Sequence, residues 1–334
     1  MAPWTASDIP SQFGRNAIIT GTGGLGYEIA LALARAGAYV IVAGRNGLKG
    51  ADAVASIRER VPNALVRFEP LDLAHLQSIA EFGARLRAGR QSLDLLINNA
   101  AVMTPPRRGA TADGFELQFG TNYLGHFALT AQLLPLLRGA RSARVVNVSS
   151  VAARNGAIDF DDLQSERRYK PMVAYSQSKL ANLLFSFELQ RRSEAGGWGV
   201  SSIAAHPGIS RTDLIPNGAG RMSLAGFVRT FLWFLFQPAA QGALPTLFAA
   251  TSPRAAGGAY YGPDKLGETR GAPALATIPT RAEDARTAAR LWNVSEQLTG
   301  ASYPLAESRS MSSAPDMSGV ALYEAGAYAG RKSE

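Results

Sequence analysis

A tyrosine and a lysine lie four residues apart in the stretch AYSQSKLANLL, at Tyr175 and Lys179. This stretch is predicted to be helical, and residues four apart in a helix lie on one face, so the phenol and the amine should point the same way. A free phenol has a pKa of about 10, and a neighbouring ammonium favours its ionised form, which makes proton transfer near neutrality possible. The spacing alone also arises by chance and needs support from other residues.

Polar residues at the ends of predicted strands supply that support. Ser149 and Ser150 end the run RVVNVSS, Asn99 closes the asparagine pair of LLINNAAV, and Asn122 begins a predicted helix in TNYLGHF. Doubly wound sheets bind their ligands at the carboxyl ends of the strands, so these side chains could surround one site. Each has a plainer explanation, because Asn122 could cap its helix and the serines could be ordinary strand-end residues.

A glycine-rich turn in IITGTGGLGYEIALALA, residues 18–34, satisfies the pattern G-x-G-x-x-G. It follows a predicted strand and leads directly into a predicted helix, which is the context a dinucleotide site requires. Glycines let the backbone approach a pyrophosphate, whose charge is met by free N–H groups at the helix start. The alternative is a tight connection without a ligand. The turn residues expected to contact a nucleotide are Gly21, Thr22, Gly23, Gly24, Leu25 and Gly26.

The residues after the second strand indicate which nucleotide binds. The stretch VAGRNGLK contains no Asp or Glu there, whereas an acidic residue normally binds the ribose 2′-hydroxyl of NAD. It contains Arg45 and Asn46 instead, and a guanidinium suits a 2′-phosphate through paired charge-assisted hydrogen bonds. The sequence therefore favours NADP(H) over NAD(H), with a merely solvated Arg45 as the alternative.

The elements that would position these residues alternate along the chain. Nearly continuous apolar runs alternate with helix-like segments from residue 15 to about 205, as expected for a parallel sheet covered on both faces. The strand candidates are 16–20, 38–43, 65–69, 93–98, 143–148 and 200–205. We predict a single-domain α/β Rossmann fold, a doubly wound parallel sheet with helices on both faces. The expected parts are an N-terminal arm (1–13), the domain (14–302) and a C-terminal tail (303–334).

Composition excludes several other classes of function. The chain has no cysteine, so disulfides, thiolate nucleophiles and cysteine metal sites are ruled out. Its net charge of +8 is spread along the chain, which argues against nucleic-acid binding and suits an anionic cofactor. No G-x-S-x-G elbow follows a strand, which excludes the common hydrolase arrangement. The three histidines, His75, His126 and His206, do not have the spacing of metal ligands, so no metal site is expected. His126 is expected to pack or hydrogen-bond locally.

Found together and in this order, these motifs resemble those of the short-chain dehydrogenase/reductase family over about residues 14–300. The insert AIDFDDLQSERRYKP, the stretch YSQSKLAN and the later QGALPTLFAAT and GGAYYGPDKLGETRG look like the branch that contains retinol dehydrogenases and related NADP-dependent reductases. Two features depart from the simplest family pattern. The glycine loop is one residue shorter than T-G-x-x-x-G-x-G, which leaves individual phosphate contacts open, and the interval from Ser150 to Tyr175 is longer.

The resemblance implies roles for particular residues. Tyr175 would be the general acid/base, Lys179 would lower its pKa and hold the nicotinamide ribose, and Ser150 would bind the substrate oxygen. Asn122 would hold a water that links Lys179 to solvent. The further nucleotide contacts that the resemblance implies are Asp72 and Leu73 at the adenine, Asn99, Ala100 and Ala101 at its ribose, and Pro207, Gly208, Ile209 and Thr212 at the carboxamide end of the nicotinamide.

The sequence thus predicts an NADP(H)-dependent oxidoreductase that moves a hydride between the cofactor and a carbonyl or secondary alcohol. The segment 213–240 would form a lid, and its Phe, Leu and Trp content indicates a bulky hydrophobic ketone or alcohol as substrate. The same residues could instead pack against a partner subunit. The resemblance implies a homodimer or homotetramer.

Two alternative functions stay open. A regulator that binds NADP without chemistry would be expected to have lost Tyr175 or Lys179, and both are present. A membrane-surface retinoid or lipid dehydrogenase could anchor through 224–240, a stretch that Arg229 and Pro238 make too short to span a bilayer but that could insert at its surface. The N-terminus has no signal-peptide pattern, so a cytoplasmic location is expected.

Overall fold

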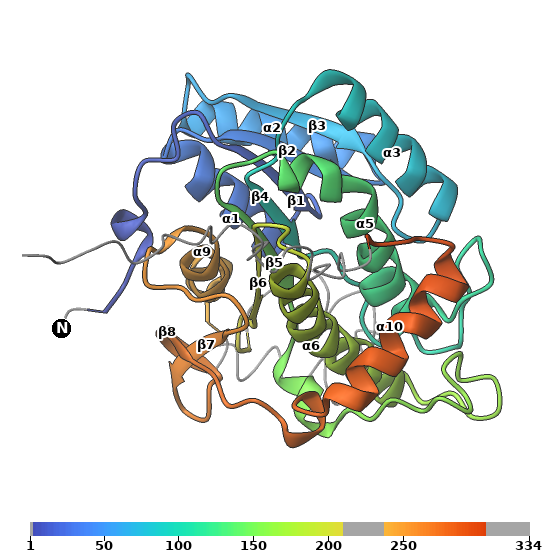
Figure 1. Cartoon of the computed structure of the whole chain (residues 1–334). Coiled ribbons are helices and arrows are strands. Elements are labelled where there is room, and N and C mark those ends of the chain that lie inside the picture. The colour runs from blue at the N-terminus through green and yellow to red at the C-terminus, as the bar shows by residue number, and fades with distance from the viewer. Residues whose placement is uncertain (1–2, 210–236, 305–334) are drawn as a thin grey trace, which may run out of the picture.

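An eight-stranded sheet forms the centre of the computed structural model, which describes residues 3–209 and 237–304 (Figure 1). The strand order is β3-β2-β1-β4-β5-β6-β7-β8, and every pairing is parallel except that of β8 with β7. The strands are β1 (Asn16–Thr20), β2 (Tyr39–Gly44), β3 (Val66–Pro70), β4 (Leu95–Asn98), β5 (Ala143–Val148), β6 (Val200–Ala205), β7 (Tyr260–Lys265) and β8 (Arg270–Leu275). The predicted doubly wound α/β fold is confirmed, and β7 and β8 extend the sheet beyond the six predicted strands.

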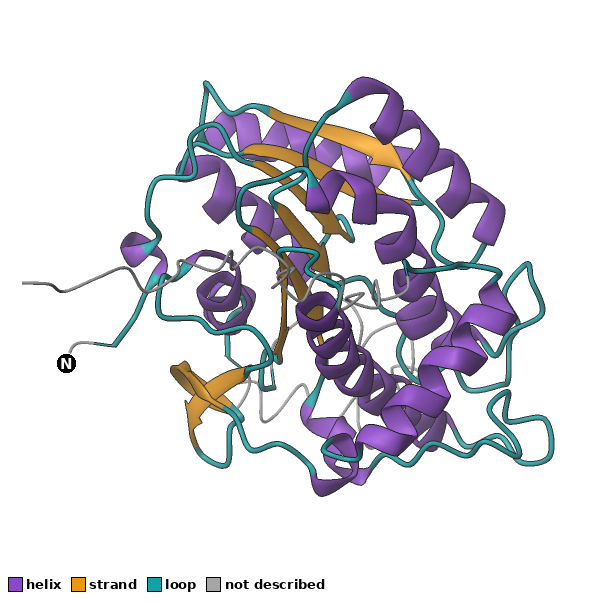
Figure 2. Ribbon diagram, in the orientation of Figure 1, coloured by secondary structure: helices purple, strands orange, loops and turns teal. Residues whose placement is uncertain are grey.

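Helices cover both faces of the sheet (Figure 2). One face carries α1 (Gly24–Arg35), α2 (Gly47–Arg60) and α9 (Leu244–Thr251), and the other carries α3 (Leu76–Gly89), α5 (Gly125–Arg138), α6 (Pro171–Ala195) and α10 (Ala285–Thr299). The neighbours Ile18 and Ile19 of β1 therefore point into separate apolar cores. This two-sided burial explains why β1 appears in the sequence as a continuous apolar run rather than an alternating one.

Short helical turns complete the described part of the chain. They are the 3₁₀ helices η1 (Ala6–Asp8), η3 (Val151–Asn155) and η5 (Thr280–Ala282), the short helices α4 (Leu117–Phe119) and α8 (Ala239–Gly242), and the π-helical turn η2 (Gly120–Leu124). Of these, η2 and η3 adjoin the candidate site. The turn η3 follows the end of β5, whereas η2 lies between α4 and α5.

Both flanking segments pack onto the domain where the structure describes them. Trp4 of the N-terminal arm is buried, and its ring meets Phe248 of α9 edge-on with centroids 5.4 Å apart. Tyr303, which the sequence assigns to the tail, is also buried, with its ring centroid 4.4 Å from that of Trp292. Its hydroxyl donates a hydrogen bond to the carbonyl oxygen of Phe127 at 2.7 Å. Tyr303 thus belongs to the aromatic core beside α5 and α10.

Replacing Tyr303 with alanine should lower the free energy of unfolding by about 3 kcal/mol, because a large aromatic side chain leaves a cavity in a packed core. Urea unfolding of the full chain measures this change. Phe13→Ala is the matched control, since Phe13 is 85% exposed and its removal should change stability by less than about 0.5 kcal/mol. Equal losses in the two variants would contradict the packing described for Tyr303.

Candidate active site

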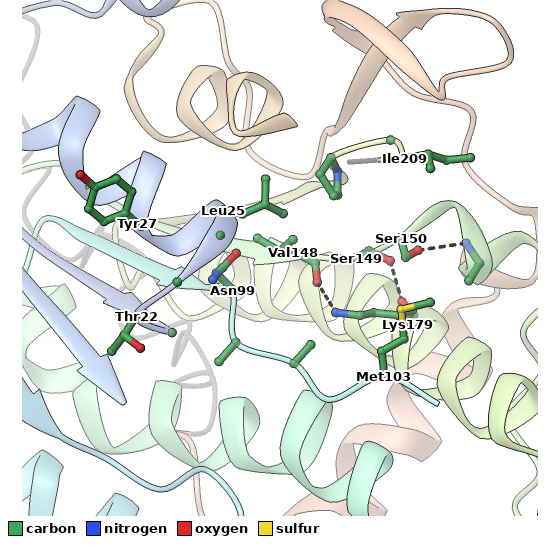
Figure 3. Close-up of a pocket in the computed structure, with 18 of the residues that line it drawn as sticks. Thr22, Leu25, Tyr27, Asn99, Met103, Val148, Ser149, Ser150, Lys179 and Ile209 are labelled. Carbon is green, nitrogen blue, oxygen red and sulfur yellow. Dashed lines mark hydrogen bonds between the residues drawn. The ribbon is translucent and has the colours of Figure 1, made fainter. Parts of the chain in front are cut away.

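A cavity of about 1040 Å³ opens at the carboxyl ends of the central parallel strands (Figure 3). The predicted site residues that line it are Gly21, Thr22, Gly23, Gly24, Leu25, Asn99, Ala100, Ala101, Ser150, Tyr175, Lys179, Pro207, Gly208 and Ile209. The predicted site residues that lie outside the lining are Gly26, Arg45, Asn46, Asp72, Leu73 and Asn122. Thr212 and nearly all of the predicted lid fall outside the described residues, as does most of the stretch 224–240. One cavity therefore brings together segments from across the chain.

The glycine turn packs so closely against the start of α1 that no side chain fits at Gly26. Helix α1 begins at Gly24, directly after the turn. A Cβ atom added at Gly26 would collide with the carbonyl oxygen of Gly21 and crowd Nδ2 of Asn99. Gly26 thus allows the helix to approach the loop closely, although it does not line the cavity. The start of α1 faces the cavity and fits the pyrophosphate of a dinucleotide.

Thr20, at the end of β1, fixes the loop that follows β4. Its Oγ1 accepts hydrogen bonds from the backbone N–H groups of Asn99 and Ala100, both at 2.9 Å. In return, Nδ2 of Asn99 donates to the carbonyl oxygen of Thr20 at 2.8 Å. Thr20 was missing from the predicted site residues, although its place directly before the glycine turn is a usable signal. These bonds lock the ends of β1 and β4 together beneath the cavity.

Asn122 holds the next part of the same loop rather than capping a helix. It lies in η2, a π-helical turn of the kind often found at functional sites. Its Oδ1 accepts from the backbone N–H of Val102 at 2.7 Å. Its Nδ2 donates to the carbonyl oxygen of Val102 at 2.9 Å and to Oγ of Ser178 at 3.0 Å. The buried amide therefore ties the β4 loop to α6.

His126 lies one helical turn after Asn122 and bonds locally, as its position predicts. Its Nδ1 is 2.9 Å from the carbonyl oxygen of Asn122, and its Nε2 is 2.9 Å from Oγ1 of Thr20. Burial lowers the pKa of His126 to about 4. The ring is therefore neutral near pH 7, so it adds no charge beneath the site.

The two serines after β5 have different positions. Oγ of Ser149 is buried and donates to the carbonyl oxygen of Lys179 at 2.8 Å. Both serines line the cavity, but Ser150 is only half-buried, and its Oγ accepts from the backbone N–H of Ala152 at 3.2 Å, which caps η3 and leaves its own proton for a ligand. Of the pair, Ser150 is thus the one whose hydroxyl can meet a ligand.

Tyr175 and Lys179 face the cavity from one side of α6, as the spacing predicts. Nζ of Lys179 donates to the carbonyl oxygen of Val148 at 3.0 Å and lies 5.8 Å from the centroid of the Tyr175 ring. Burial lowers the pKa of Lys179 to about 7. Burial also raises the pKa of Tyr175 to about 12, against the opposing effect of its hydrogen bond with Ser150. The protein by itself therefore keeps the phenol protonated, ready to donate a proton.

The corner beside α2 contains a cation that the sequence interpretation did not select. Arg45 is exposed at the end of β2, and Asn46 caps α2 through its Oδ1, which accepts from the backbone N–H of Lys49 at 3.0 Å. Lys49 itself lines the cavity. Asp72 lies two residues after β3, and its Oδ1 accepts a hydrogen bond from the backbone N–H of Ala74 at 3.0 Å, which stabilises a local turn. Lys49 lies within the same stretch VAGRNGLK as Arg45, so its charge near the end of β2 was a usable signal.

Comparison with known proteins decides the family. The model of the short chain dehydrogenase family matches residues 15–219. The chain belongs to the short-chain dehydrogenase family. Its similarity to Retinol dehydrogenase 12 from Mus musculus is 41% identity over 294 residues, covering 86% of this chain and 87% of the relative. Polyprenol dehydrogenase from Mus musculus is 40% identical over 301 residues, covering 88% and 86%.

A solved structure shows the same relationship. The crystal structure of an uncharacterized protein from Mycobacterium paratuberculosis is 42% identical to this dehydrogenase, with a TM-score of 0.75. The match covers 91% of this chain and 100% of that one. With the family established, the chain is an NAD(P)-dependent oxidoreductase that acts on alcohol or carbonyl groups. The turn at Gly21–Gly26 and the start of α1 are the elements that fit such a nucleotide.

The described ranges, 3–209 and 237–304, contain neither a membrane-spanning helix nor a metal site. Within them, no helix is long and apolar enough to cross a membrane. Within the same ranges, no group of three or more His, Cys, Asp or Glu side chains of the dehydrogenase is arranged to hold a metal ion.

Proposed function

We propose that this dehydrogenase uses NADP(H) to transfer a hydride between the nicotinamide and a carbonyl or secondary alcohol of a hydrophobic substrate. The observation that carries the proposal is the meeting of Ser150, Tyr175 and Lys179 in the same cavity as the glycine turn. A nucleotide laid from that turn toward α6 would bring its nicotinamide close to the phenol. A protein that only senses NADP would have no use for this arrangement.

The bound nicotinamide supplies or accepts the hydride. In the reducing direction, Oγ of Ser150 and the hydroxyl of Tyr175 hold the carbonyl oxygen of the substrate by hydrogen bonds. The phenol gives its proton to that oxygen as negative charge develops there. Lys179, as an ammonium, stabilises the phenolate that remains. In the oxidising direction the same groups act in reverse. The water at Asn122 that the family resemblance implies stays a prediction.

The choice of NADP(H) rests on the cations near the end of β2. Arg45 is exposed and Lys49 lines the cavity, and neither of the two residues after the strand is acidic. Both cations can meet a 2′-phosphate, which carries the extra charge that distinguishes NADP from NAD. An exposed Arg45 side chain is free to turn toward a bound nucleotide.

Arg45→Ala should weaken NADPH binding about tenfold and leave NADH binding almost unchanged, because a charge-assisted hydrogen bond is worth roughly 1.5–3 kcal/mol. Fluorescence titration with each nucleotide measures both dissociation constants. Arg138→Ala, at the far end of α5, is the control for a simple loss of positive charge. If the ratio of the two constants is the same in Arg45→Ala and the wild type, Arg45 does not select the cofactor.

The substrate side of the cavity is apolar, which supports a hydrophobic substrate. Met103, Val151, Met172 and Ile209 line it, and Met172 and Ile209 are exposed at its mouth. Among the described residues, the charged side chains that line the cavity apart from Lys179 all come from α2: Lys49, Asp52 and Arg60. Within this part of the chain, a charged substrate would therefore find no partner beside Ser150. The names of the similar dehydrogenases suggest isoprenoid alcohols and aldehydes as the first compounds to assay.

The exposed apolar mouth also favours a second candidate, a dehydrogenase that takes its substrate from a membrane surface. Met172 and Ile209 line the cavity and are exposed, and Val173, the residue after Met172, is exposed as well. Sedimentation with neutral lipid vesicles separates the two possibilities, because only a surface enzyme should move to the pellet. The cytoplasmic location and the homodimer or homotetramer stay predictions from the sequence.

A further inference from the structure

Glu268, in the turn between β7 and β8, lies between two loops that line the cavity. Its Oε2 is 3.0 Å from Nε2 of His206 and 2.6 Å from Nη2 of Arg154. Its Oε1 accepts from the backbone N–H of Thr277 at 2.8 Å. One carboxylate thus contacts His206 directly after β6, the helix η3 and the segment that follows β8.

On the β6 side, Glu268 holds the turn His206–Ile209. The N–H of Gly208 donates to Nδ1 of the buried His206 ring at 3.2 Å, so in a neutral ring Nε2 carries the proton that is donated to Glu268. The N–H of Ile209 donates to the carbonyl oxygen of Thr269 at 2.8 Å. A Cβ atom at Gly208 would collide with that same oxygen. The turn therefore rests directly on the β7–β8 turn.

On the other side, Glu268 holds η3, the helix that Ser150 caps. Arg154 lies in η3, and its Nη1 donates to the carbonyl oxygen of Gly267 at 3.1 Å while Nη2 meets Glu268. Both terminal nitrogens of the Arg154 guanidinium thus bind the β7–β8 turn. Ser150, through η3, and the turn His206–Ile209 are consequently both attached to the β7–β8 turn, and Gln237 adds a second support to the turn His206–Ile209 by donating to the carbonyl oxygens of Pro207 and Ile209.

The backbone of this segment indicates that its conformation depends on those contacts. Leu266 and Glu268 have φ angles of 50° and 67°, in the left-handed region that residues with a Cβ adopt reluctantly. Such conformations persist where the surrounding structure determines them, and they gather at functional sites. The three contacts of the Glu268 carboxylate hold the turn in this conformation.

We infer that Glu268 is a positioning residue, which sets the distance across the cavity between Ser150 and the turn His206–Ile209. The inference rests on the proposed function, in which Ser150 holds the substrate oxygen and the turn holds the nicotinamide. Hydride transfer is sensitive to this distance, because a displacement of about 1 Å can cost a hundredfold in rate. Neither Glu268 nor Arg154 lines the cavity, so both act through the groups that do.

The distance itself can be measured without any turnover. Because the chain has no cysteine, Asn155→Cys and Ile209→Cys introduce two unique sites for spin labels on opposite loops. Glu268→Ala should broaden and lengthen the label-to-label distance distribution. Glu69→Ala is the matched control, because Glu69 pairs with Arg67 at 3.1 Å with side-chain exposures of 18% and 41%, against 15% and 39% for Glu268 and Arg154. Identical distributions in Glu268→Ala and Glu69→Ala would overturn the inference.

Kinetics in the unlabelled protein give the second readout. With NADPH and all-trans-retinal, Glu268→Ala should lower kcat about tenfold or more while the dissociation constant of NADPH changes less than about threefold. Glu268→Gln, which keeps an acceptor oxygen but loses the charge, should recover part of kcat. If Glu268→Ala does not fold, Arg154→Ala replaces it in both experiments, since it removes only the link to η3. A kcat unchanged relative to Glu69→Ala would contradict the inference.

The outcomes separate this inference from the proposed function. If Tyr175→Phe turns over as fast as the wild type, or if the wild type shows no turnover, the proposed function is contradicted. The spin-label distances then decide alone whether Glu268 is a positioning residue. An inactive Tyr175→Phe together with unchanged distances in Glu268→Ala would reject only the positioning role.

Discussion

A dehydrogenase with Tyr175→Phe is expected to bind NADPH as the wild type does and to lose about 10³-fold of its kcat with any carbonyl substrate it reduces. The substitution removes one hydroxyl from the cavity wall and keeps the ring. Removing a general acid typically costs 10²–10⁴-fold in rate. Stopped-flow oxidation of NADPH measures the step, and fluorescence titration measures the binding.

Tyr123→Phe is the control for losing a buried hydroxyl elsewhere in the fold. The Tyr123 hydroxyl is fully buried and hydrogen-bonds Oγ of Ser295 at 2.7 Å, away from the cavity. This variant should be somewhat less stable yet keep its kcat. Full activity in Tyr175→Phe would show that another group donates the proton.

Lys179→Met is expected to stabilise the nucleotide-free protein at neutral pH and to lower its activity at least about a hundredfold. Burial lowers the pKa of Lys179 from 10.5 to about 7, so the folded protein releases this proton more readily than the unfolded chain. Below pH 7 the charged lysine destabilises the fold by up to about 5 kcal/mol, at 1.36 kcal/mol per pKa unit. Methionine has a similar length and carries no charge, so its burial avoids this cost.

The sign of the pH dependence follows from the same shift. Between pH 7 and 10.5 the unfolded chain binds more protons than the folded one, so the stability of the wild type rises with pH through this window. The advantage of Lys179→Met should therefore be largest at and below pH 7, fall as the pH rises, and be nearly gone at pH 10. Urea unfolding at several pH values measures it, with the exposed Lys265→Met as control. A constant difference between Lys179→Met and the wild type would mean that Lys179 is not destabilised by burial.

The sequence was sufficient to predict the first six strands, because two-sided burial produces continuous apolar runs. Strands β7 and β8 escaped the prediction because glycines and prolines interrupt them, as in YYGPDK and RGAPAL. Tyr175, Lys179 and Ser150 were predictable because helical spacing and strand ends fix where such side chains point. Their meeting in one cavity agrees with that expectation.

The rest of the site depends on contacts between distant segments. Glu268 meets a histidine 62 residues earlier, and Arg154 meets a carbonyl oxygen 113 residues later, and local patterns do not reveal such pairs. Asn122 was selected as a helix start, but its role in holding Val102 depends on where the β4 loop passes. The position of Lys49 in the cavity wall depends likewise on how α2 packs beside α1, where the hydroxyls of Tyr27 and Ser56 are hydrogen-bonded at 2.8 Å.

Deuterium transfer tests the central claim most directly. NADPH deuterated at both C4 positions is incubated with the dehydrogenase and with all-trans-retinal or a hydrophobic ketone, and the products are analysed by mass spectrometry. We predict one deuterium on the carbinol carbon of the alcohol, formed at similar rates by the wild type and Tyr123→Phe and about 10³-fold more slowly by Tyr175→Phe. Deuterated alcohol formed equally fast by Tyr175→Phe, or bound NADPH that transfers no deuterium to any of these carbonyls, would contradict it.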